Sequence, residues 1–333
     1  MDPIALTREL VQIDSPTGQE GAVGEYLARA LAGLGYAVAR QEVTPGRWNL
    51  LATRAAPVVV FSTHLDTVPP NLPFREDATH LFGRGTADAK GIAAAQIAAA
   101  ERLAAHGEQR VGLLFVVGEE YGSDGAQAAA SLGPKGRYLV NGEPTDNRLA
   151  LGHKGALYVK LAARGRAAHS AYPEEGESAI ERMLEALERV RRVPLPHDEV
   201  LGPGTLNVGT IKGGVRPNVI PESCEAEVLI RTVRDTRELR AAVVRAAGDQ
   251  VTVDFGWEMP SIRLRALPGF ETSVVRFGTD LPFLASWGEG FLLGPGSIRV
   301  AHTDHEQVEK RELLDGVALY ERLAARLIAG GGQ

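Results

Sequence analysis

Five short stretches of the chain each carry a side chain that can bind a divalent metal ion. They are STHLDT (62–67), GRGTADAKG (83–91), GEE (118–120), NGEPT (141–145) and AHTDHE (301–306). The candidate ligands are two imidazoles and three carboxylates: His64, Asp88, Glu120, Glu143 and His302. With one carboxylate shared, such a set suits two zinc ions that each keep an open position. The sequence therefore predicts a dinuclear metal centre.

The elements that must position these residues alternate between strands and helices. Residues 18–35 have helical periodicity, and strand-like runs follow at 37–43, 49–53 and 57–62. A helix at about 88–106, a strand at 111–117, a helix at about 124–132 and a strand at 137–141 continue the pattern. Such alternation predicts an α/β layer with a mainly parallel central sheet. His64, Glu120 and Glu143 follow the ends of predicted strands, where open α/β sheets bind ligands.

The pattern changes after residue 154. Strands and helices are predicted in the ferredoxin-like order β-α-β-β-α-β, at 155–164, 177–193, 205–211, 224–232, 235–247 and 250–257. The α/β pattern resumes near residue 270 and closes with a helix at 310–328. Because His302 must meet Glu143 across this segment, we expect one catalytic metal-binding domain, residues 1–153 and 268–333. It is interrupted by an inserted α+β domain, residues 154–267.

Composition limits the classes of partner. The 333-residue chain is 44% hydrophobic and carries a net charge of −6, which argues against nucleic acid or an anionic membrane as partner. Its single cysteine, Cys224, lies in an alternating strand-like run and allows no intrachain disulfide. We find no secretory signal, and the most apolar stretch (91–105) is interrupted by polar and charged residues. A cytoplasmic protein is expected.

With these motifs in place, the chain resembles the co-catalytic zinc amidohydrolase and peptidase family of acetylornithine deacetylase, succinyl-diaminopimelate desuccinylase, aminoacylase and carboxypeptidase G. The resemblance runs from SPTGQE (15–20) to the closing helix. It implies two zinc ions, for which cobalt or manganese can substitute. Asp88 would bridge them and precede a cis peptide bond. Asp66 would orient the His64 imidazole, and Glu119 would be the general base that deprotonates a metal-activated water.

Simpler interpretations stay open for single motifs. Asp88 can also serve as a helix N-cap, and adjacent glutamates such as Glu119 and Glu120 commonly lie in solvent. AHTDHE also offers His305 as a ligand. Since the resembled family has its histidine four residues before a glutamate, as in His302 and Glu306, the resemblance favours His302.

The inserted domain carries a second group of residues. The resemblance implies that His169, in RAAHSAYP, reaches into a neighbouring active site and stabilises the substrate's carbonyl oxygen there. Asn218 and Arg231 would bind the substrate's carboxylate. The loops GTD (278–280) and GPGS (294–297) are expected to line the pocket, with Gly294 and Gly296 contacting substrate. The inserted domain would then be a dimerisation domain, and the protein a homodimer.

The function predicted from these residues is hydrolysis of the amide bond of an N-acyl-L-amino acid. Deacetylation of acetylornithine, desuccinylation of succinyl-diaminopimelate and release of carrier-protein-linked lysine or ornithine all fit. The alternative is a small-peptide metallopeptidase of the aminopeptidase, dipeptidase or carboxypeptidase G type, which differs only in its pocket. A non-catalytic ligand-binding relative is a remote alternative, because such a protein should have lost the base or a ligand and all six positions are filled.

Overall fold

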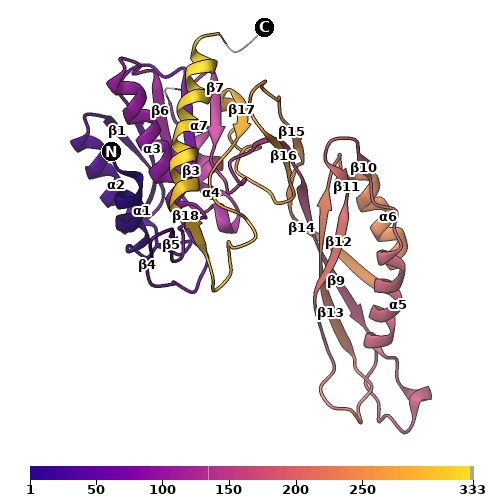
Figure 1. Cartoon of the computed structure of the whole chain (residues 1–333). Coiled ribbons are helices and arrows are strands. Elements are labelled where there is room, and N and C mark those ends of the chain that lie inside the picture. The colour runs from indigo at the N-terminus through magenta and orange to yellow at the C-terminus, as the bar shows by residue number, and fades with distance from the viewer. Residues whose placement is uncertain (134, 331–333) are drawn as a thin grey trace. The chain divides into compact units, whose positions relative to one another are not determined.

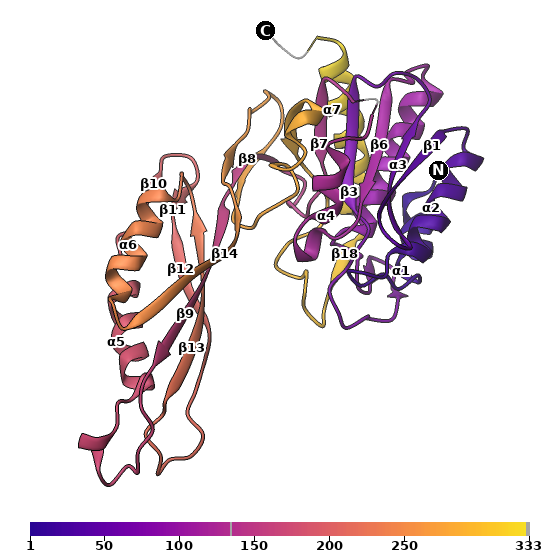
Figure 2. The ribbon, with the colours of Figure 1, turned by 180° about the vertical axis from the view of Figure 1, so that it is seen from behind.

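The computed structural model describes residues 1–133 and 135–330 and divides into two compact units. Unit 1 comprises Met1–Leu151, Leu264–Ser273 and Thr279–Gln333, and unit 2 comprises Gly152–Arg263 and Val274–Gly278 (Figures 1 and 2). Compared with the bounds expected from the sequence, residues 264–267 lie in unit 1, and residues 152–153 and 274–278 lie in unit 2. Three short strands, β8 (Leu149–His153), β15 (Ile262–Arg263) and β16 (Thr272–Val275), form a small sheet of order β15-β8-β16.

Unit 1 is built on a six-stranded sheet of order β1-β2-β6-β3-β7-β17. Its strands are β1 (Ala37–Thr44), β2 (Arg47–Thr53), β3 (Val59–His64), β6 (Val111–Val116), β7 (Tyr138–Asn141) and β17 (Glu289–Leu292). The last four are parallel to one another, and β1 and β2 add an antiparallel edge. Every residue of β3 and β6 is buried, as the continuous apolar runs of a covered parallel sheet require. The predicted α/β fold with a mainly parallel central sheet is confirmed.

Helices α1 (Pro3–Val11), α2 (Gly21–Gly33), α3 (Lys90–Ala105), α4 (Asp124–Ala129) and α7 (Lys310–Ile328) pack around this sheet. The alanine-rich α3 is the most buried and contacts α1, α7 and β3. The small side chains of α3 let neighbouring backbones approach closely. On α7, the Tyr320 ring packs against Phe61 of β3 with ring centroids 5.2 Å apart. A small sheet of order β18-β5-β4 uses β4 (Arg75–Glu76), β5 (His80–Phe82) and β18 (Gln307–Glu309). Short 3-10 turns lie at Glu119–Tyr121 (η1) and Ala285–Trp287 (η3).

Unit 2 contains the predicted β-α-β-β-α-β order. Its elements are β9 (Gly155–Arg164), α5 (Ala179–Arg191), β12 (Thr205–Gly213), β13 (Ser223–Thr232), α6 (Arg237–Ala247) and β14 (Val251–Met259), with a 3-10 turn η2 (Pro173–Glu175). The antiparallel sheet has the order β12-β13-β9-β14, which is the ferredoxin-like arrangement. Both helices lie on one face of it (Figures 1 and 2), where Met183, Leu187 and Val243 fill a core that also buries Cys224. The Pro/Gly-rich link holds a small hairpin, β10 (His197–Asp198) and β11 (Gly202–Pro203).

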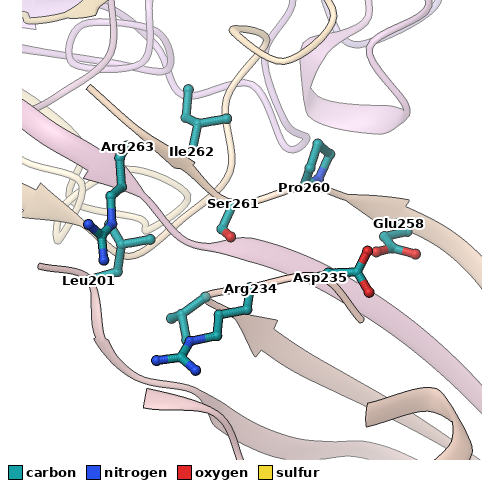
Figure 3. A pocket seen from close by; sticks show the side chains of 9 residues that line it. Leu201, Arg234, Asp235, Glu258, Pro260, Ser261, Ile262 and Arg263 are labelled. Carbon is teal, nitrogen blue, oxygen red and sulfur yellow. The ribbon is translucent and has the colours of Figure 1, made fainter. Parts of the chain in front are cut away.

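A cavity of about 310 Å³ lies in unit 2 near the ends of β13 and β14 (Figure 3). Several of its charged side chains are already paired. Arg263 donates to Asp198 at 2.6 Å, and Arg237 pairs with Asp235 at 3.0 Å. Glu258 is paired with Arg240. Most of the charged side chains that border this cavity therefore already have a partner of opposite charge within unit 2.

Among the described helices of the whole chain, none has the length and apolar character that crossing a membrane requires.

Candidate metal centre

Three parallel strands deliver the candidate ligands to one edge of the unit 1 sheet. His64 is the last residue of β3, Glu119 and Glu120 follow β6 in η1, and Glu143 follows β7. The turn after β6 depends on Gly118, which has φ +76°. A Cβ there would lie 1.9 Å from a carboxylate oxygen of Asp124, so a side chain at this position would displace Asp124 as well as strain the left-handed backbone that glycine adopts freely.

The structure brings five side chains into two clusters that share Asp88. One consists of His64, Asp88 and Glu143, and the other of Asp88, Glu120 and His302, with the ligand atoms of each within 4.8 Å of one another. The Asp88 Oδ1 atom lies 3.0 Å from His64 Nε2, and its Oδ2 atom lies 3.4 Å from His302 Nε2. His302 Nε2 also lies 2.9 Å from Glu120 Oε2. One carboxylate therefore faces both clusters.

Asp66 belongs to neither cluster but contacts three residues of the site. The Nδ1 atom of His64 faces the backbone carbonyl of Asp66 at 2.9 Å, which leaves Nε2 free to face the cluster. The two carboxylate oxygens of Asp66 accept hydrogen bonds from the backbone N–H groups of Glu119 and Glu120, each at 3.1 Å. Thr17 donates a further hydrogen bond at 2.8 Å. Asp66 thus holds a candidate base and a candidate ligand through its carboxylate and orients the imidazole through its backbone carbonyl.

The two clusters hold more carboxylates than positively charged groups, so bound cations would stabilise them. Burial raises the pKa of Glu119, and the neighbouring Asp280 and Glu120 raise it further. Burial also raises the pKa of Glu143, whose Oε1 atom is buried without a hydrogen-bond partner in the described structure. Carboxylates this close together are stable in the ionised state only beside positive charge. The set of two imidazoles and three carboxylates therefore fits two divalent metal ions.

Comparison with known proteins agrees with this geometry. Residues 60–326 match the sequence profile of "Peptidase family M20/M25/M40". The chain belongs to this family. A protein of Aspergillus fumigatus named "probable carboxypeptidase" is 38% identical over 375 residues, which cover 96% of this chain and 85% of the relative. The family resemblance read from the motifs is confirmed, and this M20 protein is a hydrolase of peptide or amide bonds.

Solved structures show the same fold. The aminopeptidase PepT from Bacillus cereus superposes with a TM-score of 0.80 at 20% identity, covering 98% of both chains. A Bacillus subtilis protein described as a dinuclear metal-binding peptidase of the M20 family gives 0.71 at 14% identity, covering 98% of this chain and 97% of that one.

The structure bears on three further expectations for the site. The Asp88–Ala89 peptide bond is cis, as predicted. The N-cap of α3 is Ala89, without a side-chain cap, so Asp88 does not fill the N-cap position that was its simpler interpretation. His302 reaches the clusters from a left-handed backbone conformation with φ +61°, whereas His305 is exposed and belongs to neither cluster.

Gly294 and Gly296 lie against the loops that carry the candidate ligands. A Cβ on Gly294 would lie 2.4 Å from the backbone oxygen of Glu143, and one on Gly296 would lie 3.2 Å from the Cβ of Ala87. Close packing of backbones is thus sufficient to require glycine at the first position. Their contact with substrate stays a prediction.

The residues predicted in the inserted segment fall into two places within unit 2. His169 and Asn218 lie in neighbouring loops, joined by a bridge from His169 to Val219 and by a hydrogen bond from Ser170 N to Asn218 O at 3.1 Å. Arg231 pairs with Ala156 near the other end of β13. This ten-residue strand spans roughly 30 Å at about 3.3 Å per residue. Within unit 2, the structure therefore brings His169 and Asn218 together but places Arg231 far from both.

Asp280 is a residue of the site that the sequence analysis did not single out. It is 1% exposed, and neither carboxylate oxygen makes a hydrogen bond of normal geometry in the described structure, although the Ser123 hydroxyl lies close enough to lower its pKa. Burial raises its pKa to about 7, and it lies close enough to Glu119 and Glu143 to raise their pKa values too. The motif GTD (278–280) predicted a loop that lines the pocket, but no local sequence pattern predicted that its aspartate would be buried.

The metal-free protein offers a test of this burial. Asp280 keeps its proton to a higher pH in the folded state than in the unfolded chain, so its contribution to stability is present at low pH and lost as pH rises from about 4 through about 7. Asp280→Asn is therefore expected to gain stability relative to the wild type over this interval, by at most about 4 kcal/mol for a three-unit shift. Chemical denaturation with chelator present, at several pH values, measures the difference. A difference that does not change with pH would contradict the assignment.

Proposed function

We propose that this M20 protein is a metallopeptidase that hydrolyses short peptides with two divalent metal ions and Glu119 as general base. The observation that carries the proposal is the Asp88 carboxylate, which faces a ligand cluster on each side with Glu119 close by. The names of the relatives, carboxypeptidase and peptidase, support a peptidase more than the N-acyl-amino-acid deacylase favoured by the sequence analysis. Deacylation becomes the second candidate.

The residues divide the chemistry as follows. His64, Asp88 and Glu143 would hold one metal, and Asp88, Glu120 and His302 the other. Two zinc ions, or cobalt or manganese in their place, would supply activation of a water molecule and polarisation of the scissile carbonyl. The Glu119 carboxylate takes a proton from the attacking water and passes it to the leaving amine nitrogen. In the metal-free protein burial raises the pKa of this carboxyl. Two bound cations would lower that pKa again and keep the carboxylate ionised, so that it can accept the proton.

A hydrolysis panel distinguishes the candidates. Zinc-loaded protein would be tested with di- and tripeptides, with the same peptides amidated at the C-terminus or acetylated at the N-terminus, and with N-acetylornithine, N-succinyl-diaminopimelate and carrier-linked lysine. We expect cleavage of short unblocked peptides. Cleavage confined to the N-acyl amino acids would overturn the peptidase proposal in favour of the deacylase. Glu119→Gln is the control for contaminating hydrolases.

A homodimer through unit 2 is part of the proposal. The outer edge of β12 is unpaired in its sheet, and beside it α5 and β12 border a groove of about 470 Å³. Leu184 on α5 and Ile211 on β12 are 49% and 47% exposed at this groove. An open strand edge with exposed apolar neighbours is typical of a surface that pairs with a second copy. The wide separation of Arg231 from His169 and Asn218 supports a substrate site that takes these residues from different chains.

Subunit mixing tests whether His169 acts in the partner's site. Glu119→Gln and His169→Ala are each expected to be inactive. In a dimer of the two variants, an in-trans histidine leaves one site with both residues intact. Equal mixing should then restore up to about a quarter of wild-type activity, since half of the dimers are mixed and half of their sites are intact. Mass spectrometry of labelled chains verifies exchange. No recovery after verified exchange would assign His169 to its own chain.

A further inference from the structure

Glu306 binds the loop that carries the shared aspartate. Its side chain is 1% exposed. Oε1 accepts hydrogen bonds from the backbone N–H groups of Gly85, Ala87 and Asp88, at 2.8, 3.2 and 3.1 Å. Oε2 accepts one from Nη1 of Arg84 at 2.6 Å. A single carboxylate therefore holds this loop up to the residue that contributes to both clusters.

Stability alone is a weak reason for such an arrangement. Arg84 is only 2% exposed, so both charges of the pair are removed from water. Desolvation costs several kcal/mol for each ion, and well-packed apolar residues of the same volume often stabilise a fold at least as well. What an apolar pair cannot supply is an acceptor for the three N–H groups, which fix the backbone that leads into Asp88.

The same glutamate also anchors the segment that carries His302. His302, Asp304 and His305 are exposed, and Glu306 is the next fully buried residue along the chain. Its backbone oxygen accepts a hydrogen bond from Gly83 N at 3.1 Å. By contrast, His64 and Glu143 are positioned by the ends of β3 and β7. Glu306 thus helps to position two of the three residues in the His302 cluster, Asp88 and His302. In the His64 cluster it helps to position only Asp88.

We infer that Glu306 is a positioning residue that fixes Asp88 and His302 relative to each other and so sets the metal affinity of the His302 cluster. The inference rests on the metal centre of the proposed function. Loss of such a partner outside the ligand set typically weakens metal binding or activity by about 10–100-fold. We expect a loss of this size at the His302 cluster and a smaller one at the His64 cluster.

The test titrates zinc into metal-free wild type and into Glu306→Ala, Glu306→Gln and His302→Ala, in competition with a chelator, so no turnover is needed. The Glu306 variants should weaken the binding of one zinc ion by about 10–100-fold and that of the other by less. His302→Ala identifies which of the two affinities belongs to the His302 cluster. Glu101→Gln is the matched control, because Glu101 pairs with Arg54 at 2.7 Å in the same unit without contacting the loop. It should lower the unfolding temperature and leave both affinities unchanged.

The outcomes separate the inference from the function on which it rests. If the Glu306 variants bind two zinc ions with wild-type affinities, the inference is overturned and the proposed metal centre stays intact. This holds even if the variants unfold at a lower temperature. A wild type that binds fewer than two would overturn both. Should Glu306→Ala fail to fold, Glu306→Gln decides, because it keeps the size and one acceptor oxygen while it loses the charge that pairs with Arg84.

Discussion

Glu119→Gln is expected to lower kcat by about 10²–10⁴-fold, the usual effect of removing a general base. Glutamine has nearly the same shape but cannot take the proton from water. Asp66 accepts a hydrogen bond from the backbone N–H of residue 119 at 3.1 Å and does not bind its side chain. The substitution should therefore leave the turn unaffected. Steady-state kinetics and metal analysis on the same preparation should show lost turnover with full metal content.

The neighbouring Glu120→Ala provides the comparison. Glu120 belongs to the His302 cluster, so its removal should release metal, and part of the lost activity should return at high zinc concentration. Should Glu119→Gln instead lose metal while Glu120→Ala keeps it, the roles of base and ligand would have to be exchanged.

Asp88→Ala is expected to have the broadest effect on the metals, because both clusters lose a member at once. Affinity at each position should fall by more than the roughly 10–100-fold that loss of an outer partner costs. Turnover should then fall below detection at ordinary zinc concentrations. Metal content after dialysis, measured by elemental analysis beside the kinetics, checks both statements.

Asp304→Ala is the matched control, since Asp304 is an exposed aspartate near His302 that belongs to neither cluster. It should retain two metals and normal turnover. Two tightly held metals in Asp88→Ala would mean that the clusters do not share this carboxylate as a ligand.

Much of the fold could be predicted because burial leaves a periodic trace in the sequence. The apolar run PVVVFS predicts a covered strand, and β3 begins at Val59 within it. Alternation predicted β9 at its observed bounds. Strands as short as β4 and β10 have no detectable period, since two residues are too few to show one and the strands are defined only by pairing with β5 and β11. Helix α1 was also not predicted, although Asp2 caps it and Pro3 begins it.

The candidate ligands could be found for a related reason. His64 and Glu143 follow recognisable strands, and parallel strands end at one edge of the sheet. The residues behind them could not be assigned a task. Glu306 was visible as part of a motif, but its bond to Arg84 joins residues 222 positions apart. The burial of Asp280 likewise depends on packing that no local pattern records.

The interruption of unit 1 by unit 2 has a consequence for synthesis on the ribosome. Translation adds about 5–20 residues per second. Glu143, the last of the three residues of the His64 cluster, therefore leaves the exit tunnel roughly 8–30 seconds before His302, which is 159 positions further along (302 − 143). During that interval the ferredoxin-like core of unit 2, from β9 to β14, is made as one contiguous stretch of sequence. In the nascent chain the candidate ligands of the His64 cluster are therefore all synthesised before the His302 cluster can be completed, and the loop of Asp88 gains its Glu306 anchor only at that later stage.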